Sequence, residues 1–175
     1  MTLPAQIKIA SYSPEWPRRF EGERVLLATV FPSATCQIEH VGSTAVPGFG
    51  AKPIIDVLVG AATLAEIEMR IPALEVLGYQ YVPEHEAEFP QRRIFAKPTV
   101  RPSQVHVHAV KIDSRFWAHQ LLFRDVLRAD PALAAEYCAL KIELAGRFGD
   151  DREGYADAKG PFIEQAVQRA AKRAA

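Results

Sequence analysis

Residues 38–59 read IEHVGSTAVPGFGAKPIIDVLV, a pattern typical of a strand, a glycine-rich turn and a second strand. The first predicted strand ends at the turn formed by Gly42 and Ser43, and the second covers residues 54–59. A short and almost continuous apolar run predicts a buried strand. Its one acid, Asp56, needs a hydrogen bond, a counter-charge or a metal ion, because an unpaired buried charge costs several kcal/mol. The function of the chain depends on what Asp56 faces.

Composition and charge limit the classes of function. The chain has 175 residues, which favours one domain over residues 1–175, and its 21 basic and 21 acidic side chains give a formal net charge of zero. A protein without a basic field is not expected to bind nucleic acid or a membrane through global electrostatics. The sequence shows no signal peptide and no bilayer-length apolar run, and Cys36 and Cys138 have no CxxC partner. These features predict a cytoplasmic protein with reduced cysteines and no membrane partner.

Strand-like runs occur only before Ser114, and the chain after it has helical patterns alone. The predicted strands are 6–12, 35–41, 54–59, 79–82, 88–97 and 104–110. The predicted helices are 15–31, 63–77, 115–129, 131–148 and 155–173, the last broken near Gly160 and Pro161. We therefore predict the α+β class, with a small mixed β-sheet, flanking helices and a helical C-terminal part packed on the sheet.

The turn at Gly42 and Ser43 has the residue types of a phosphate-binding turn. A glycine lets the backbone approach a phosphate closely, and Ser43 adds a hydroxyl and an N–H that can bind it. Lys52, which precedes the second strand, either neutralises that phosphate as a point charge or is an ordinary surface lysine. The turn therefore predicts a site for a nucleotide or another phosphorylated small molecule.

A second set of polar side chains follows from strand alternation. Side chains two residues apart on a strand share a face, so His106 and His108 lie on one face of the predicted strand 104–110. If this face meets Asp56, the three side chains form a catalytic and metal-binding site. The alternatives are a solvent-facing polar strand without metal and an Asp56 that only accepts structural hydrogen bonds.

These motifs resemble the nucleotidyltransferase superfamily, in which a Gly-Ser turn holds a triphosphate and the next strand carries two metal-binding carboxylates. A longer resemblance, to the signature of the GrpB family, covers almost the whole chain. The segments that carry it are EHVGSTAVPG at 39–48, AKPIID at 51–56, HVH at 106–108, FRD at 123–125 and the pair Tyr155 and Lys159. The resemblance implies the nucleotidyltransferase fold, and related segments are fused to dephospho-coenzyme A kinases in some bacteria. A fold does not by itself fix a function.

The chain departs from the superfamily pattern at Leu58. The second metal carboxylate is expected there, two residues after Asp56 and on the same face. The later strand offers His106 and His108 where the superfamily has a further acid. Hard Mg²⁺ prefers oxygen ligands, whereas imidazole suits Zn²⁺ or Mn²⁺ better. A divalent metal (Mg, Mn or Zn) is therefore expected at an atypical site, and two-metal catalysis is in doubt.

Further cations are candidates for contact with the phosphate. Lys159 shares a helical face with Tyr155, and a lysine on an apolar face must reach a partner or extend to solvent. Arg92 and Arg93 point to opposite faces of a regular strand, so only one of them can serve the site. The pattern does not decide between them, and we take Arg93 as the candidate. The predicted phosphate-binding residues are Gly42, Ser43, Lys52, Arg93 and Lys159.

Three functions are consistent with these residues. The first is a nucleotidyltransferase-like enzyme with Asp56, His106 and His108 at its catalytic centre, where histidine suits proton transfer near neutral pH. The second is a binding module that holds a nucleotide or a coenzyme A precursor without turning it over, which the missing acid at Leu58 favours. A third reading is metal-dependent hydrolysis or oxygenase chemistry at a site of two histidines and one aspartate.

Overall fold

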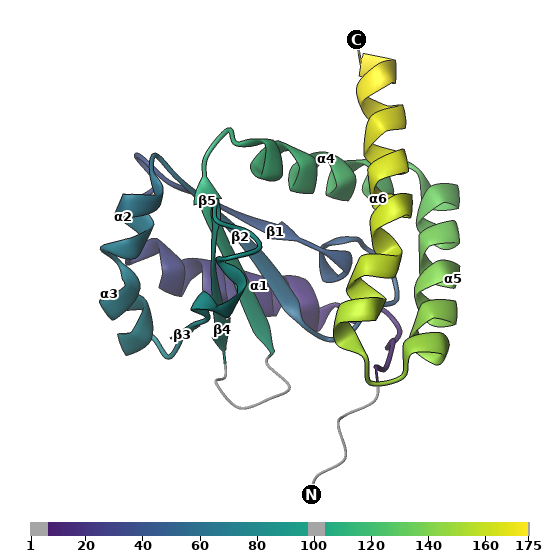
Figure 1. The fold of residues 1–175 in the computed structure, drawn as a ribbon, viewed down its shortest axis with the longest axis horizontal. Coiled ribbons are helices and arrows are strands. Elements are labelled where there is room, and N and C mark those ends of the chain that lie inside the picture. The colour runs from purple at the N-terminus through teal and green to yellow at the C-terminus, as the bar shows by residue number, and fades with distance from the viewer. Residues whose placement is uncertain (1–6, 98–103, 175) are drawn as a thin grey trace, which may run out of the picture.

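The computed structural model describes residues 7–97 and 104–174, and its centre is a mixed five-stranded sheet with the strand order β1-β2-β5-β4-β3 (Figure 1). The strands are β1 (Gln37–Val41), β2 (Ile55–Ala61), β3 (Gln80–Tyr81), β4 (Arg92–Lys97) and β5 (Val105–Lys111). The central strands β2 and β5 are parallel, and the other neighbours are antiparallel. The small mixed sheet predicted from the sequence is confirmed.

The helices fall into a group before β5 and a group after it. The first group is α1 (Glu15–Ala28), α2 (Leu64–Glu68) and α3 (Ile71–Val76), with the short 3-10 turns η1 (Ser43–Ala45) and η2 (Pro83–His85). The second group is α4 (Arg115–Ala129), α5 (Pro131–Phe148) and α6 (Arg152–Ala174). Helices α5 and α6 run side by side at one end of the sheet, as Figure 1 shows. The predicted helical C-terminal part is therefore present.

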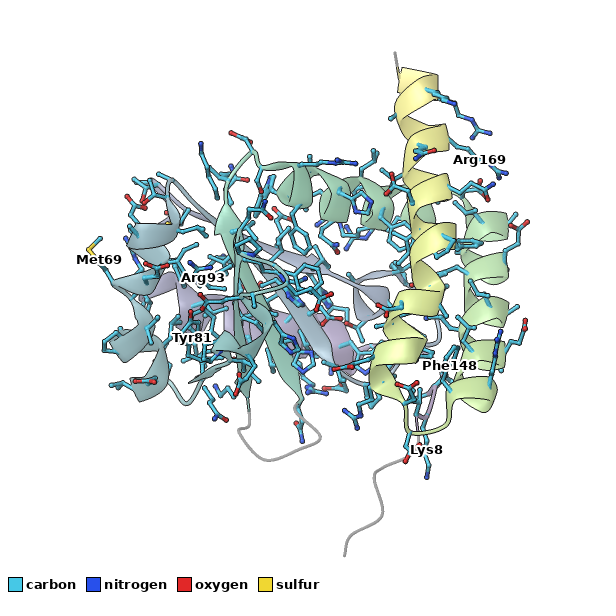
Figure 2. All side chains as sticks on the ribbon, viewed as in Figure 1. Lys8, Met69, Tyr81, Arg93, Phe148 and Arg169 are labelled. Atoms are coloured by element: carbon cyan, nitrogen blue, oxygen red, sulfur yellow. The ribbon has the colours of Figure 1, made fainter. Side chains whose placement is uncertain are left out.

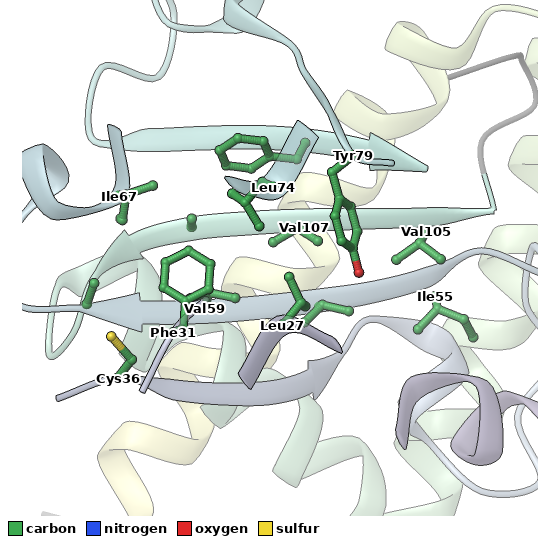
Figure 3. Packing of buried hydrophobic residues seen from close by; sticks show 14 of the residues in the cluster. Leu27, Phe31, Cys36, Ile55, Val59, Ile67, Leu74, Tyr79, Val105 and Val107 are labelled. Atoms are coloured by element: carbon green, nitrogen blue, oxygen red, sulfur yellow. The ribbon is translucent and has the colours of Figure 1, made fainter. Parts of the chain in front are cut away.

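One face of the sheet, which we call the core face, is covered by α1, α2 and α3. It carries Val57 and Val59 of β2 and Val107 of β5, and strand alternation puts their neighbours on the other side. These side chains pack in one buried cluster with Leu27 of α1 and Leu74 of α3 (Figure 3). The near-continuous apolar pattern of β2 is thus explained by burial on both faces of the sheet.

The opposite face, which we call the site face, carries Asp56 of β2 and His106 and His108 of β5. Helix α4 covers only one end of it, where Trp117 packs against Leu58. Helices α5 and α6 form a second layer beside this face. Their buried cluster with α4 also encloses the loop that follows η1.

Three predicted elements differ from the structure in their limits or continuity. The helix predicted at 63–77 is two short helices, because Pro72 has no N–H to continue the first one. The strand predicted at 88–97 begins only at Arg92, after Pro90. The helix predicted to break near Gly160 and Pro161 is continuous in α6. Gly160 lacks the Cβ that would clash with the proline ring, so the helical conformation is kept.

The strand predicted at 6–12 is also wrong over the residues that the structure describes. In this segment a single bridge joins Ala10 to Ala51, with both backbone hydrogen bonds formed. The remainder of the segment lacks a strand from Ile7 onward, and Gln6 lies outside the described residues. The bridge anchors the segment beside the loop that leads into β2.

Candidate functional site

The turn at Gly42 lies directly against Asp56. Gly42 has φ 71 and ψ −173, a backbone region that is accessible almost only to glycine. A Cβ added to Gly42 would overlap the carboxylate of Asp56. Glycine is therefore required here both by the backbone conformation and by the close approach of the turn to β2.

Asp56 meets both histidines on the site face. In the parallel ladder Asp56 is paired with His106, and Leu58 is paired with His108. Oδ1 of Asp56 lies 3.8 Å from Nδ1 of His106 and 3.8 Å from Nε2 of His108. The predicted common face of His106 and His108 is present, and the structure shows that this face meets Asp56, which the sequence left open.

The carboxylate of Asp56 is held ionised by its surroundings. Burial raises the pKa of Asp56, but His108, His106 and the ammonium of Lys159 outweigh this effect and lower the pKa below its ordinary value. Burial lowers the pKa of His106, although the charge of Asp56 opposes the shift. The combination of an ionised acid with neutral imidazole is suited to accept a proton.

The three side chains are not arranged as a ready set of metal ligands. Across residues 7–97 and 104–174, no group of three His, Cys, Asp or Glu side chains is placed to hold a metal ion. Metal bonds of about 2 Å in a tetrahedral site place ligand atoms about 3.4 Å apart, closer than the 3.8 Å from Asp56 to each histidine. The donor types still suit Zn²⁺ or Mn²⁺ better than Mg²⁺.

Leu58 occupies the position where the superfamily pattern has its second carboxylate. Its side chain is 0% exposed and packs with Val41, Val110 and Trp117. Gly60 allows this packing, since a Cβ there would come within 2.8 Å of the indole of Trp117. Leu58 thus lies on the site face beside His108, and its side chain is enclosed in the apolar cluster beneath α4.

Lys52 and Lys159 converge on one aromatic ring. Their ammonium groups lie 4.6 Å and 4.5 Å from the centroid of Tyr155, on α6. Burial lowers the pKa of both lysines, that of Lys159 to about 8, and the charge of Asp56 opposes the shift in both cases. Two residues predicted to bind phosphate from separate parts of the sequence are therefore brought together.

A third lysine, Lys141 of α5, completes this group, and the sequence-based set omits it. Its side chain is 2% exposed, and Nζ donates hydrogen bonds to the Ser43 hydroxyl at 3.0 Å and to the carbonyl of Gly50. Nζ also lies 3.8 Å from the centroid of Phe49. Burial lowers the pKa of Lys141 to about 7, and the charges of the other two lysines act in the same direction. We call Lys52, Lys141 and Lys159 the lysine cluster.

The prediction for Arg93 is wrong. Strand alternation places Arg93 on the core face, where Nε and Nη2 donate to one carboxylate oxygen of Glu68 at 2.9 Å and 2.6 Å. A carboxylate oxygen of Glu86 lies 3.7 Å from Nη1. Figure 2 shows Arg93 on the side of the sheet that carries α2 and α3. Its neighbour Arg92 lies on the site face, opposite Val110 of β5.

Two arginines of α4 hold the turn at Gly42 and Ser43 in place. Arg124 donates to the carboxylate of Glu39 at 2.7 Å and to the carbonyl of His40 at 3.1 Å. Arg128 donates through Nε and Nη2 to the carbonyl of Ala45 at 3.0 Å and 2.8 Å. Both ends of the turn are therefore tied to the same helix, so its conformation depends on the docking of α4.

The comparison with known protein families gives a match over nearly the full chain. The model of the family described as "GrpB protein" matches residues 6–169. The "Glutamate-rich protein GrpB" of Alkalihalophilus pseudofirmus is 32% identical, and the match covers 91% of this chain and 93% of that protein. A "Dephospho-CoA kinase" of Mycolicibacterium paratuberculosis is 29% identical over 95% of this chain, which spans only 46% of that enzyme.

Solved structures agree with this match. The crystal structure of a conserved protein GrpB from Enterococcus faecalis has a TM-score of 0.84 and 32% identity, and covers 95% of this chain and 98% of that one. A structure of a GLD-2/RNP-8 complex has a TM-score of 0.55 at 13% identity, over 85% of this chain and 58% of that one. A structure of Cid1, described by its RNA terminal uridylyl transferase activity, has a TM-score of 0.51 at 13% identity, over 76% and 41%. The last two likenesses show the fold alone.

The described helices also bear on a membrane location. Within residues 7–97 and 104–174, no helix combines the length and the apolar character that a membrane span requires.

The sheet order, the turn beside Asp56 and the family match point to one classification. The chain belongs to the GrpB family and has a fold like that of the nucleotidyltransferases.

Proposed function

We propose that the chain binds a nucleotide or another phosphorylated small molecule at the lysine cluster and the turn at Gly42 and Ser43. The observation that carries this proposal is that no described carboxylate is directly ion-paired with the cluster, although the charge of Asp56 acts on Lys52 and Lys159 from beyond 4.0 Å. Within the described residues, none of the three lysines has a carboxylate oxygen within 4.0 Å. Like charges gathered without a partner cost free energy that a bound phosphate would return.

The ligand class follows from the residues that meet at the cluster. Lys52 and Lys159 each supply an ammonium as a point charge, and Lys141, whose pKa is about 7, adds a third when it is protonated. Ser43 supplies a hydroxyl beside a turn whose glycine permits close backbone approach. A ligand with two or three phosphates would satisfy several cations at once. The match to a dephospho-coenzyme A kinase adds coenzyme A precursors to the nucleotides as candidates. A nucleotide ligand also agrees with the cytoplasmic location predicted from the sequence.

Binding without the two-metal reaction is the function that the geometry supports best. The superfamily pattern expects carboxylates at positions 56 and 58 of β2. Because position 58 is a leucine packed in an apolar cluster, Asp56 is the one of these two that is present, and two-metal transfer needs bridging acids. A second candidate is transfer chemistry in which His106 or His108 acts as a general base, because both face an ionised Asp56. A divalent ion (Mg, Mn or Zn) belongs to this second candidate.

Isothermal titration tests the first candidate with ATP, GTP and dephospho-coenzyme A, each with and without Mg²⁺, Mn²⁺ or Zn²⁺. We expect Lys159→Met and Lys52→Met to weaken binding by about tenfold or more each, since a charged hydrogen bond contributes about 1.5–3 kcal/mol. The matched control is Lys111→Met, which removes an exposed lysine at the end of β5. An absence of binding at millimolar ligand, or equal affinity in the lysine variants and the control, would overturn the proposal.

The second candidate has its own readout. Asp56→Asn should leave phosphate binding at the lysine cluster largely intact and abolish turnover if the histidines need the ionised acid. Turnover is measured by release of pyrophosphate from the nucleotide that binds. A wild-type chain that binds the nucleotide without pyrophosphate release over hours would leave the binding module as the function.

A further inference from the structure

Adjacent residues Arg92 and Arg93 have opposite environments. Arg93, on the core face, is bonded to Glu68, lies near Glu86 and donates to the carbonyl of Pro90. Arg92, on the site face, has no carboxylate oxygen within 4.0 Å among the described residues. Its buried Nε has no hydrogen-bond partner in the described part of the chain. The chain thus pairs one of the two guanidinium groups and leaves the other free.

Two aromatic rings fix the plane of the free guanidinium. The Cζ atom of Arg92 lies 4.3 Å from the centroid of Phe89 and 5.0 Å from that of Phe116, which belongs to α4. Such contacts hold the side chain while its in-plane N–H groups stay available. Burial lowers the pKa of Arg92, and the charge of Glu88 opposes this shift without an ion pair within 4.0 Å. Among the described residues, the guanidinium is a held donor group without an acceptor.

Phe116 links Arg92 to the histidine side of the site. The ring of Phe116 lies 6.4 Å from the imidazole of His108, and Ile94, two residues after Arg92, pairs with His108 across the ladder. The site face therefore carries, from one side to the other, the lysine cluster, Asp56 with the two histidines, and Arg92. A planar guanidinium at this position matches an oxyanion, which it can bind through two parallel hydrogen bonds.

We propose that Arg92 is a second oxyanion-binding residue, which takes a phosphate group on the His108 side of the site face. The assignment rests on the proposed function in one respect, that a ligand or pair of substrates spans from the lysine cluster to Arg92. The phosphate bound by Arg92 is then either the far end of one ligand or part of an acceptor brought to the histidines. In both cases the guanidinium of Arg92 binds a phosphate group.

Inorganic phosphate is the probe, and phosphorus NMR titration of the full chain counts its sites. The wild type is expected to bind two phosphates, Arg92→Gln to lose one, and Lys159→Met to lose the other. Arg93→Gln is the matched control and should keep both, because it lies on the core face. Arg92→Lys keeps the charge without the planar fork, and we expect about tenfold weaker binding at this site. Urea unfolding of each variant shows that the lost site does not reflect an unfolded chain.

Each outcome separates this inference from the proposed function. Loss of one phosphate in Arg92→Gln with both retained in Arg93→Gln supports the second site. Two phosphates in a folded Arg92→Gln, or one phosphate in the wild type that only Lys159→Met removes, overturns it and leaves the lysine cluster in place. One phosphate that only Arg92→Gln removes supports this inference and overturns the proposed role of the lysines. A wild type that binds no phosphate overturns both.

Discussion

The Nζ of Lys141 donates a hydrogen bond to the Oγ of Ser43 at 3.0 Å, across a sequence separation of 98 residues. This bond joins α5 to the turn that lies against Asp56. The lysine is almost fully buried, and its environment favours the neutral form, because burial lowers its pKa to about 7. A bound phosphate would favour the charged form of Lys141, and keeping that charge buried costs folding free energy.

The first prediction is that Lys141 makes the stability of the fold depend on pH. The folded chain releases the Lys141 proton near pH 7, while the unfolded chain keeps it up to the ordinary lysine pKa of about 10.4. Unfolding therefore takes up a proton in this window, and the free energy of unfolding rises with pH there. Lys141→Met should reduce the slope by about 1 kcal/mol per pH unit between about pH 7.5 and 9.5. Urea unfolding followed by tryptophan fluorescence measures it.

The control for this prediction is Lys111→Met, an exposed lysine whose removal should leave the slope as in the wild type. The raised pKa values of Tyr79, Tyr137 and Tyr155 would reduce stability only at higher pH, as the unfolded tyrosines begin to ionise near 10. An identical slope in Lys141→Met and the wild type would contradict the burial of an ionisable Lys141.

The second prediction concerns the two glycines with positive φ in the loop between β1 and β2. Gly42→Ala places a Cβ against Asp56 and strains the backbone, so we expect a loss of about 3 kcal/mol or more. Gly48→Ala has a similar φ of 74 but no heavy atom within 4 Å of the new Cβ, and should cost about 1–2 kcal/mol. The comparison of their urea midpoints isolates the contact with Asp56. Equal losses would argue against that contact.

The third prediction is that an acid at position 58 does not restore a metal site. The side chain of Leu58 is enclosed by Val41, Val110 and Trp117, so Leu58→Asp buries an unpaired charge and should cost about 4 kcal/mol or more. Leu58→Met keeps the volume and should cost less than about 1.5 kcal/mol. Calorimetric titration with Mn²⁺ should detect no gain in affinity for the aspartate variant. A folded Leu58→Asp with new metal affinity would show that a side chain at this position can share a metal ion with Asp56 or His108.

The fourth prediction is a decline of anion binding at high pH. Lys159 has a pKa of about 8, and only its protonated form attracts an anion, so affinity should fall as pH rises through that value. Sulfate is the probe, because its charge is constant over this range. Its affinity should fall by up to about tenfold per pH unit for each lysine that loses its proton. In Lys159→Met the affinity is lower and its pH dependence weaker. A constant wild-type affinity would count against a role for this lysine.

Periodicity alone was enough to place several site residues. Strand alternation put His106 and His108 on a common face, and a helical wheel put Lys159 beside Tyr155. Both features depend only on the backbone geometry of one element, which the sequence determines. The structure adds that this strand pairs with β2 in the register that brings Asp56 opposite His106.

Tertiary packing determines the environment of the residues for which periodicity leaves alternatives. The side chains of Arg92 and Arg93 point to opposite faces of any regular strand. Which of them lies on the core face depends on where α2 places Glu68. Lys141 flanks the apolar face of the helix predicted at 131–148, so the sequence supports it only as a weaker candidate than Lys159. Its buried position depends on the turn from residue 42, which packs against α5. Tyr137 lies one turn before Lys141, Leu144 lies nearly one turn after it, and both are buried. Their spacing is the sequence feature that indicates a buried position for Lys141.

Helix α6 supplies both Lys159 and Tyr155, although the turn at Gly42, Asp56 and both histidines come from earlier parts of the chain. During synthesis the sheet and its first layer of helices can form while α6 is still being made. Such a nascent chain would expose Asp56 without the ammonium of Lys159 that acts on it in the finished protein. If the lysine cluster binds phosphate as proposed, the ligand would be held only after the last helix has docked, and a bound phosphate would oppose the detachment of that helix.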